Sequence, residues 1–171
     1  SPPGVIVDLG TGSGNLALAL KHSFGHAEVH AVDLSEQAIE VAEMNVAKTG
    51  LEVNLHHGDL FETLPRRLRG QVDLIISNPP YIATSQRDAL PAEVREHEPD
   101  LALFAGDDGL DALRRIVESA PGWLAPGGLL ACEIGADQGE SAARLVSWAA
   151  PEVFTDLSGR DRFLLVTKGD V

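Results

Sequence analysis

The chain has 171 residues, enough for one domain around one hydrophobic core, and 44% hydrophobic with 23% charged residues is an ordinary globular composition. Its net charge of −13 argues against a partner held through phosphates, because such binding depends on clustered Lys and Arg. No membrane span of ~20 apolar residues and no signal-peptide pattern is present. The single cysteine, Cys132 in LLACEI, cannot form an internal disulfide and is expected in the core. We therefore expect a cytoplasmic protein that acts on a folded protein or a small molecule, without a membrane partner.

Short apolar, β-rich runs alternate with amphipathic stretches along the first half of the chain, which is typical of βαβ units in a mostly parallel sheet. A helix is predicted for residues 15–24. Ser35 is expected to cap a second helix, which Gly50 ends. The first four strands are predicted at residues 5–9, 29–34, 53–57 and 72–77.

The second half begins with an irregular stretch. Residues 84–107 are polar and too long for an ordinary connection in a compact domain, so we expect this segment to be functional or mobile. Asp108 is expected to cap the next helix, and LLACEI at residues 129–134 predicts the fifth strand.

The end of the chain predicts one helix and a hairpin. Asp137 and Glu140 have the spacing of a capping box, so a helix is expected from there to residue 149. EVFTDL and RFLLVTK flank the short turn SGRD, which predicts an antiparallel hairpin. Its last strand must then lie antiparallel beside the fifth strand.

A glycine-rich turn, DLGTGSG, lies between the first strand and the first helix. Gly10, Gly12 and Gly14 allow a tight turn and the close approach of a ligand, and the N–H groups of the helix point into the same space. A purely structural turn is the alternative. Asn15 stands where a dinucleotide fingerprint needs its third glycine, and no lysine follows as in a P-loop, so neither pyrophosphate nor triphosphate binding is supported.

Acidic residues lie at the predicted ends of the first three strands. Asp33 can accept both hydroxyls of a ribose, although it can also simply complement a helix N-terminus. Asp59 in HGDLF can accept a hydrogen bond from an adenine amino group, with Leu60 or Phe61 against the ring, or it is a turn residue. A ribose and an adenine without a pyrophosphate site indicate S-adenosylmethionine. Asp8 is a candidate to attract its positive charge, with a structural role as the alternative.

SNPPYI follows the fourth strand. Prolines end strands, so a plain strand terminator is one interpretation. If the sheet reverses its order between the first and fourth strands, however, this segment faces the usual ligand crevice. There the Asn78 side-chain oxygen and the Pro79 carbonyl can hold one NH2 group, with Pro80 fixing the direction and Tyr81 forming a flat wall. The pattern predicts in-line methyl transfer to an amino or amide nitrogen, driven by orientation and electrostatics.

The motifs DLGTGSG, AVDLS, GDLF and SNPPYI, in this order and spacing, resemble class I S-adenosylmethionine-dependent methyltransferases. EVREHEPDLALFAGDDGLDALRRI and LAPGGLLACEIGADQGE are similar to the HemK-type glutamine-N5 methyltransferases, and the resemblance covers residues 5–167. It implies an α/β, Rossmann-like class I methyltransferase fold: a seven-stranded, mostly parallel sheet with a C-terminal antiparallel hairpin and helices on both faces.

The resemblance also implies a substrate and a set of contacts. The substrate is the glutamine of a Gly-Gly-Gln loop in peptide chain release factors, held by Asn78 and Pro79, and Glu98-Pro99 would help to shape its pocket. Leu60 departs from the family, which often has Trp there, so adenine stacking would become aliphatic packing. The family's helical N-terminal domain is not found in the sequence, so residues 1–171 are expected to form the catalytic domain. The implied cofactor contacts are Gly10, Thr11, Gly12, Ser13, Gly14, Asp33, Leu60 and Asn78.

Other functions share some of these features. A ribosomal-protein glutamine methyltransferase is the nearest alternative, and adenine-N6 or cytosine-N4 enzymes share the Asn-Pro-Pro-Tyr motif, although the acidic charge disfavours nucleic acid as the substrate. A non-enzymatic cofactor-binding module would not need both acceptors of that motif. The six histidines are scattered without metal-ligand spacing, so no metal is expected.

Overall fold

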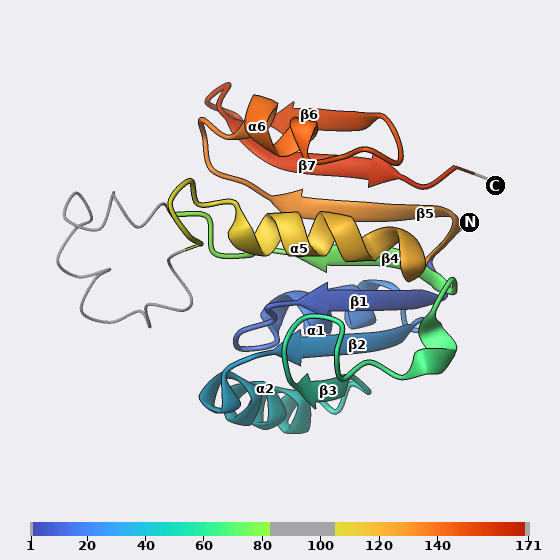
Figure 1. The fold of residues 1–171 in the computed structure, drawn as a ribbon. Coiled ribbons are helices and arrows are strands. Elements are labelled where there is room, and N and C mark those ends of the chain that lie inside the picture. The colour runs from blue at the N-terminus through green and yellow to red at the C-terminus, as the bar shows by residue number, and fades with distance from the viewer. Residues whose placement is uncertain (1, 83–104, 170–171) are drawn as a thin grey trace, which may run out of the picture.

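The computed structural model describes residues 2–82 and 105–169. Its strands form a seven-stranded sheet in the order β3-β2-β1-β4-β5-β7-β6 (Figure 1). The strands are β1 (Val5–Leu9), β2 (Glu28–Asp33), β3 (Asn54–His57), β4 (Val72–Ser77), β5 (Leu124–Glu133), β6 (Pro151–Thr155) and β7 (Asp161–Thr167). The α-helices are α1 (Asn15–Ser23), α2 (Glu36–Thr49), α5 (Asp111–Ser119) and α6 (Gly139–Arg144), and η1 (Arg66–Leu68) and η3 (Ala120–Gly122) are 3-10 turns.

The sheet has the predicted topology. β1 pairs in parallel with both β2 and β4, so the strand order reverses between β1 and β4. β7 is antiparallel to both β5 and β6 and lies between them. The predicted fold class, with its C-terminal hairpin beside the fifth strand, is confirmed.

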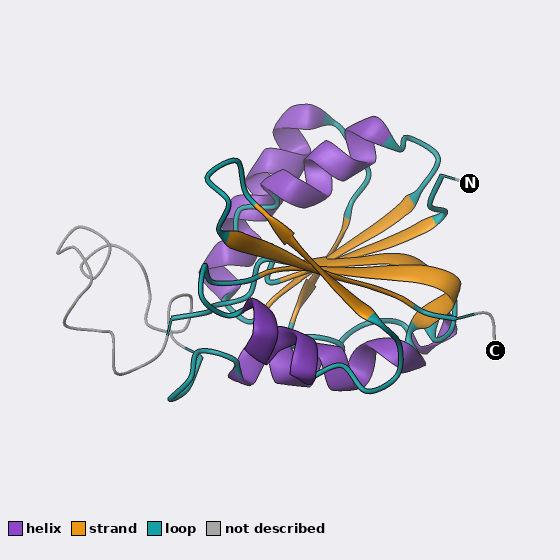
Figure 2. Cartoon of the chain, turned by 90° about the horizontal axis from the view of Figure 1, so that it is seen from above, coloured by secondary structure: helices purple, strands orange, loops and turns teal. Residues whose placement is uncertain are grey.

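Helices cover both sides of the twisted sheet (Figure 2). On one side, α1 packs through Ala17 against Ile6 and Val29. On the other side, α5 buries Ile116 within a larger cluster that includes Ile75. The central strand β1 is buried from residue 6 to residue 9, because helices cover its two faces.

Several local predictions are confirmed. The Ser35 hydroxyl accepts a hydrogen bond from the Ala38 amide at 3.3 Å at the start of α2, and Gly50 ends this helix with a positive φ of 67°. Cys132 is buried, and its burial raises the pKa of its thiol to about 12, as suits a core residue.

Two predicted helix starts are wrong in detail. Asp137 and Glu140 form no capping box: α6 begins at Gly139 without a side-chain cap and ends at Arg144, before the predicted residue 149. Asp108 accepts a hydrogen bond from the Leu110 amide at 3.0 Å, and α5 starts only after this turn.

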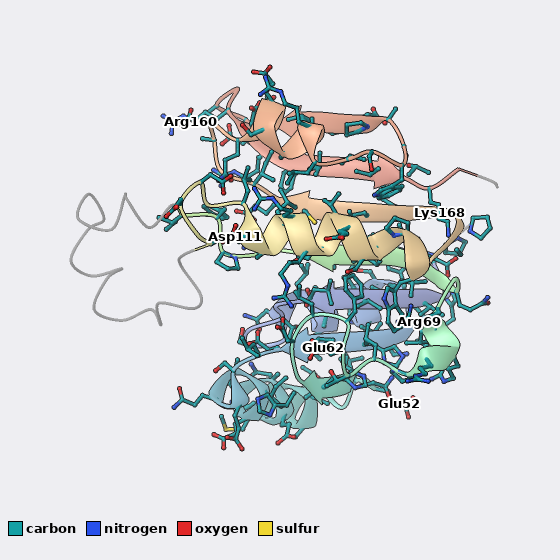
Figure 3. All side chains as sticks on the ribbon, viewed as in Figure 1. Glu52, Glu62, Arg69, Asp111, Arg160 and Lys168 are labelled. Atoms are coloured by element: carbon teal, nitrogen blue, oxygen red, sulfur yellow. The ribbon has the colours of Figure 1, made fainter. Side chains whose placement is uncertain are left out.

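Most of the predicted functional or mobile segment, residues 84–104, lies outside the described residues, and so does Glu98-Pro99. Among the residues that are described, no helix combines the length and apolar character needed to cross a bilayer. The carboxyl ends of the parallel strands lie on the side of Asp111, and Arg69 and Lys168 lie on the opposite side (Figures 1 and 3).

Candidate active site

The glycine-rich turn and the Asn-Pro-Pro-Tyr segment meet at the switch point between β1 and β4. Leu9 and Ser77 are register partners, and the Ser77 hydroxyl donates a hydrogen bond of 2.7 Å to the Leu9 carbonyl. A Cβ built on Gly10 would lie 4.0 Å from the carbonyl oxygen of Asn78. The two motifs therefore lie side by side at the carboxyl ends of β1 and β4, where open α/β sheets have their ligand crevice.

The glycine turn is held in place by its neighbours. The amides of Gly10 and Thr11 both donate to the Val32 carbonyl, at 2.8 and 3.0 Å. The Ser13 carbonyl accepts a bond of 2.9 Å from the Asn45 side chain on α2. The turn therefore keeps its shape through contacts to β2 and α2.

The three glycines of the turn have different reasons to be glycine. Gly10, Gly12 and Gly14 all have positive φ, at 71°, 57° and 79°. A Cβ on Gly14 would meet the Cβ of Ala42 at 3.1 Å, so this position allows α1 and α2 to pack closely. A Cβ on Gly12 would have nothing within 4 Å, so the space beside it is open to a ligand.

Asp8 lies behind the turn, not on its open surface. It is 1% exposed, and one carboxylate oxygen accepts a 2.6 Å hydrogen bond from the Thr11 hydroxyl. Burial raises the pKa of Asp8 to about 6, although the Thr11 hydroxyl and the Ala17 amide oppose the shift. Any attraction between Asp8 and a bound cation therefore acts across the turn.

Asp33 anchors the turn from the end of β2. Its Oδ2 accepts a bond of 2.8 Å from the Gly12 amide, and its Oδ1 accepts one of 2.9 Å from the Ser35 amide. A carboxylate offers about four acceptor sites, so about two remain for other donors. The geometry is compatible with the predicted ribose contact and adds an anchoring role that the sequence did not predict.

The segment after β3 is fixed by α5. Asp59 receives a 2.9 Å hydrogen bond from Arg115 on α5, and the pair is partly exposed. Leu60 has a φ of 49°, an uncommon backbone conformation for leucine. Phe61 is buried with its ring stacked on Trp123 at a centroid distance of 5.6 Å, which leaves Leu60 as the candidate for contact with an adenine.

On the acceptor side of the crevice, the two predicted hydrogen-bond acceptors make no hydrogen bond to a described residue. Asn78 is exposed, Pro79 is buried, and Pro80 and Tyr81 are half-buried. Within residues 2–82 and 105–169, neither the Asn78 side chain nor the Pro79 carbonyl has a hydrogen-bond partner. Both acceptors predicted from the sequence are thus available at the edge of the crevice.

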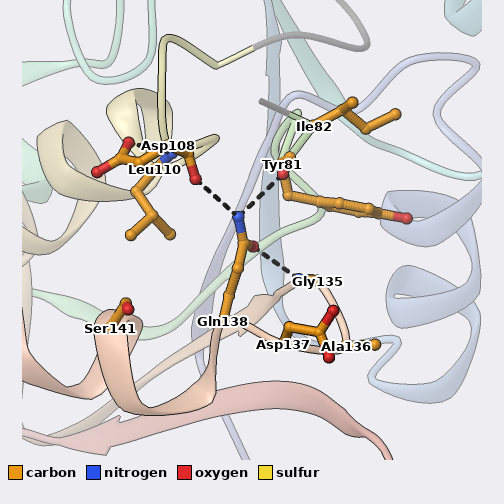
Figure 4. A pocket seen from close by; sticks show the side chains of 9 residues that line it. All are labelled: Tyr81, Ile82, Asp108, Leu110, Gly135, Ala136, Asp137, Gln138 and Ser141. Carbon is orange, nitrogen blue, oxygen red and sulfur yellow. Dashed lines mark hydrogen bonds between the residues drawn. The ribbon is translucent and has the colours of Figure 1, made fainter. Parts of the chain in front are cut away.

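A cavity of about 420 Å³ lies beside this segment, between the ends of β4 and β5 (Figure 4). Tyr81 and Ile82 line one side, and residues 135–138 after β5 line another. The Gln138 side chain lies between them and bonds to the Tyr81 carbonyl at 2.9 Å. Neither Gln138 nor Arg115 was singled out from the sequence. The available signal for Gln138 was its place just after the fifth strand, at the edge of the sheet where the other motifs lie.

Residues 2–95 match the family model described as "Methyltransferase small domain". The chain belongs to the methyltransferase small domain family. One curated relative is the release factor glutamine methyltransferase of Thermosynechococcus vestitus. It is 47% identical to this chain over 165 residues, which cover 93% of this chain. The similarity to glutamine methyltransferases that the motifs predicted is therefore confirmed. The aligned part makes up 56% of the relative, so this chain spans about half the length of that protein.

Solved structures of other methyltransferases share the fold. A methyltransferase from Pyrococcus furiosus superimposes with a TM-score of 0.69 at 20% identity, covering 96% of this chain and 75% of its own. A 16S rRNA methyltransferase of T. thermophilus, solved with AdoMet and guanosine, gives a TM-score of 0.67 at 21% identity and covers 96% of this chain and 37% of its own. At these identities the likeness supports the fold alone.

Proposed function

We propose that the protein transfers a methyl group from S-adenosylmethionine to the side-chain amide nitrogen of a glutamine in peptide chain release factors. The observation that carries the proposal is the pair of acceptors on Asn78 and Pro79, which make no hydrogen bond to any described residue and lie next to the open glycine turn. The similarity to a release factor glutamine methyltransferase supports this substrate over others. The proposal assigns the protein to translation termination in the cytoplasm, with residues 1–171 forming the catalytic domain.

The residues around the glycine turn fit the cofactor. Gly12 leaves open space above the turn, and Asp33 keeps about two acceptor sites for ribose hydroxyls. In the proposed complex, Asp59 would accept a hydrogen bond from the adenine amino group, and Leu60 would contact the face of the ring. When bound, the cofactor supplies a methyl group activated by a positively charged sulfur. The negative charge of Asp8 favours that cation from behind the turn.

The acceptor residues can hold and aim an amide. The Asn78 side-chain oxygen and the Pro79 carbonyl accept the two N–H bonds of the glutamine, and Tyr81 supports its flat face. These contacts would orient the nitrogen for an in-line displacement, which requires a separation of ~3–3.5 Å from the carbon that is transferred. A methylated amide nitrogen would lose its extra proton to water as the carbon–sulfur bond breaks, so the site would need no strong base. Orientation and electrostatics then account for the rate.

Labelled S-adenosylmethionine tests the proposal when it is incubated with a release factor, with ribosomal proteins and with an oligonucleotide in parallel. We expect label on the release-factor glutamine and none in the presence of the Asn78→Ala variant. If only ribosomal proteins are labelled, the release factor is not the substrate and a ribosomal protein is. Label on the oligonucleotide would refute the proposal that the protein methylates glutamine. Calorimetry with the unlabelled cofactor shows whether Asn78→Ala still binds it.

A further inference from the structure

Gln138 joins three separate segments at the acceptor side of the crevice. Its Nε2 donates to the carbonyl of Tyr81 at 2.9 Å, and more weakly to those of Asp108 and Gly109 at 3.3 and 3.4 Å. Its Oε1 accepts a hydrogen bond from the Gly135 amide at 2.8 Å. Figure 4 shows the side chain at the centre of these groups. The end of β4, the turn before α5 and the turn after β5 are thus held by one amide.

The backbone around Gln138 is shaped to admit this amide. A Cβ on Gly135 would lie 2.9 Å from the Gln138 Oε1, so a larger residue there would push the side chain away. Although Gln138 occupies the N-cap position of α6, its side chain makes no cap bond to that helix. The geometry therefore directs the side chain toward the acceptor segment.

The acceptor segment makes few other hydrogen bonds to the part of the chain that the structure describes. Pro79 and Pro80 have no N–H groups, and Asn78 makes no side-chain hydrogen bond among the described residues. The Ile82 carbonyl accepts one bond of 3.0 Å from the Ala105 amide. Among the described residues, Gln138 is the group that hydrogen-bonds to the Tyr81 carbonyl.

The requirement is for an amide side chain. The Tyr81, Asp108 and Gly109 carbonyls need a donor, and the Gly135 amide needs an acceptor. Glutamate has no hydrogen-bond donor when it is ionised. Methionine has no donor, and its thioether sulfur is only a weak acceptor. Only an amide of this length satisfies both sides.

We propose that Gln138 is a positioning residue that fixes the acceptor segment Asn-Pro-Pro-Tyr for the incoming glutamine amide. This inference rests on the proposed function. Gln138 lies on the β5 side of β4, whereas all the cofactor candidates except Asn78 follow β1, β2 and β3, and Gln138 makes no hydrogen bond to Asn78. Its loss therefore affects use of the acceptor and leaves cofactor binding unchanged.

Hydrogen exchange tests the positioning role without any activity. The variants are Gln138→Met, which removes both hydrogen-bonding groups, and Gln138→Glu, which keeps the bond to Gly135. Gln71→Glu is the matched control, because Gln71 is exposed and precedes β4 at the opposite end of the sheet. We expect the Ala105 amide to exchange about tenfold faster in both Gln138 variants, since local opening sets its protection. Wild-type protection in both would overturn the proposal.

Kinetics then test the effect on the reaction. We expect kcat/KM for the acceptor to fall about tenfold or more in both variants, while the Kd for S-adenosylmethionine stays within about twofold. The positioning role would be refuted if cofactor affinity fell by the same factor as kcat/KM for the acceptor, or if kcat/KM did not change. If the wild-type protein methylates no glutamine, the proposed function fails, and the exchange of Ala105 alone decides whether Gln138 holds the segment.

The Gln138→Glu variant adds a pH signature. A protonated glutamic acid can again donate one hydrogen bond to the Tyr81 carbonyl. We expect its kcat/KM, divided by that of the wild-type protein at the same pH, to rise as the pH falls from 8 to 6. Asp108, Asp137 and Tyr81 line the same cavity but are present in both proteins, so the ratio removes their contribution. A flat ratio would contradict the donor role.

Discussion

The two sides of the crevice are built in opposite ways. On the cofactor side, backbone amides and the carboxylate of Asp33 fix the glycine turn before any ligand arrives. On the acceptor side, Asn78 and Pro79 make no hydrogen bond to a described residue through their predicted acceptors, and the Gln138 side chain bonds to the next residue but one, Tyr81. Under the proposed function, the cofactor site is therefore formed before binding, and the acceptor site offers hydrogen-bond acceptors that no described residue occupies.

The difference follows from what each ligand needs. A small cofactor is bound well by a surface that loses little freedom on binding. An acceptor amide must instead find hydrogen-bond partners that are not already occupied, because a paired acceptor would have to break its existing bond first. Substitutions on the two sides should therefore separate cofactor affinity from methyl transfer.

The largest expected effect is on the acceptor side. Asn78→Ala removes one of two oriented acceptors, and we expect kcat to fall by about 100- to 1,000-fold, on the scale of losing one preorganised group that acts in the transition state. Asn78 is also an implied cofactor contact, so cofactor affinity should weaken, but by much less than kcat falls. Asn54→Ala on β3 is the control for loss of an asparagine. A Kd for the cofactor that weakens in parallel with kcat would remove the distinction between the two sides.

The next effect belongs to the cofactor side. Asp33→Ala should weaken cofactor binding by roughly 2–3 kcal/mol, the scale of lost charge-assisted hydrogen bonds. Asp73→Ala is a matched control, because Asp73 also accepts two backbone amides, those of Gly4 and Val5, at the start of β1. Both variants should lose stability, but only Asp33→Ala should lose cofactor affinity in calorimetry. Unchanged affinity in Asp33→Ala would refute the ribose contact.

Asp8 should link pH to both stability and binding. Its pKa is about 6 in the folded protein and about 3.9 when unfolded, so the folded state binds more protons between these values. The free energy of unfolding therefore falls as the pH rises from about 4 to about 6, by ~3 kcal/mol in total, and stays lower above that range. Cofactor affinity should change the other way and increase as Asp8 ionises.

Asp8→Asn isolates this linkage. The variant should gain about 1–2 kcal/mol of stability at pH 7, because a buried charge is removed while the Thr11 hydroxyl keeps an acceptor. Urea denaturation from pH 4 to pH 8 measures the gain, and Asp107→Asn, at an exposed position, is the control. A stability profile with the same slope as the wild-type protein would contradict the burial of a titrating Asp8.

The smallest effects distinguish two glycines of the same turn. Gly14→Ala should lower stability by about 1–2 kcal/mol. Alanine at position 14 would have to adopt a positive φ, and its Cβ would meet Ala42. Gly12→Ala should cost about 1 kcal/mol from the backbone alone, since its Cβ enters open space. Gly12→Ala should then lose more cofactor affinity than Gly14→Ala. Thermal unfolding and calorimetry on both variants measure these differences, and the reverse order would exclude a ligand beside Gly12.

The sequence predicted those features that depend on local pattern. The alternation of strands and helices predicted the mostly parallel sheet, and the site at SNPPYI was predicted on the condition that the strand order reverses between β1 and β4, which the structure shows. The contacts that it did not predict join residues far apart in the chain. Gln138 and Tyr81 are 57 positions apart, and Arg115 and Asp59 are 56 apart.

The capping-box error has the same origin. Asp137 and Glu140 have the right local spacing, but the N-cap residue of α6 is Gln138, whose side chain bonds to the distant Tyr81 carbonyl and not to the helix. The histidines show this too. His30 and His56 seemed scattered, yet they lie on adjacent strands with ring nitrogens 2.9 Å apart, and burial lowers the pKa of each. Spacing along the chain cannot reveal pairs that only the sheet brings together.

The position of β7 has a consequence for how the molecule is made. β6 pairs with β7, and β5 has one of its two edges covered by the same strand. A ribosome synthesises the chain from its N-terminus, so β6 is made before β7, the strand with which it pairs. The edge of β5 that pairs with β7 also has no partner strand until residues 161–167 have been added. The nascent sheet can therefore reach its final width only after residues 161–167 have been made, when β7 enters between two strands that were synthesised before it.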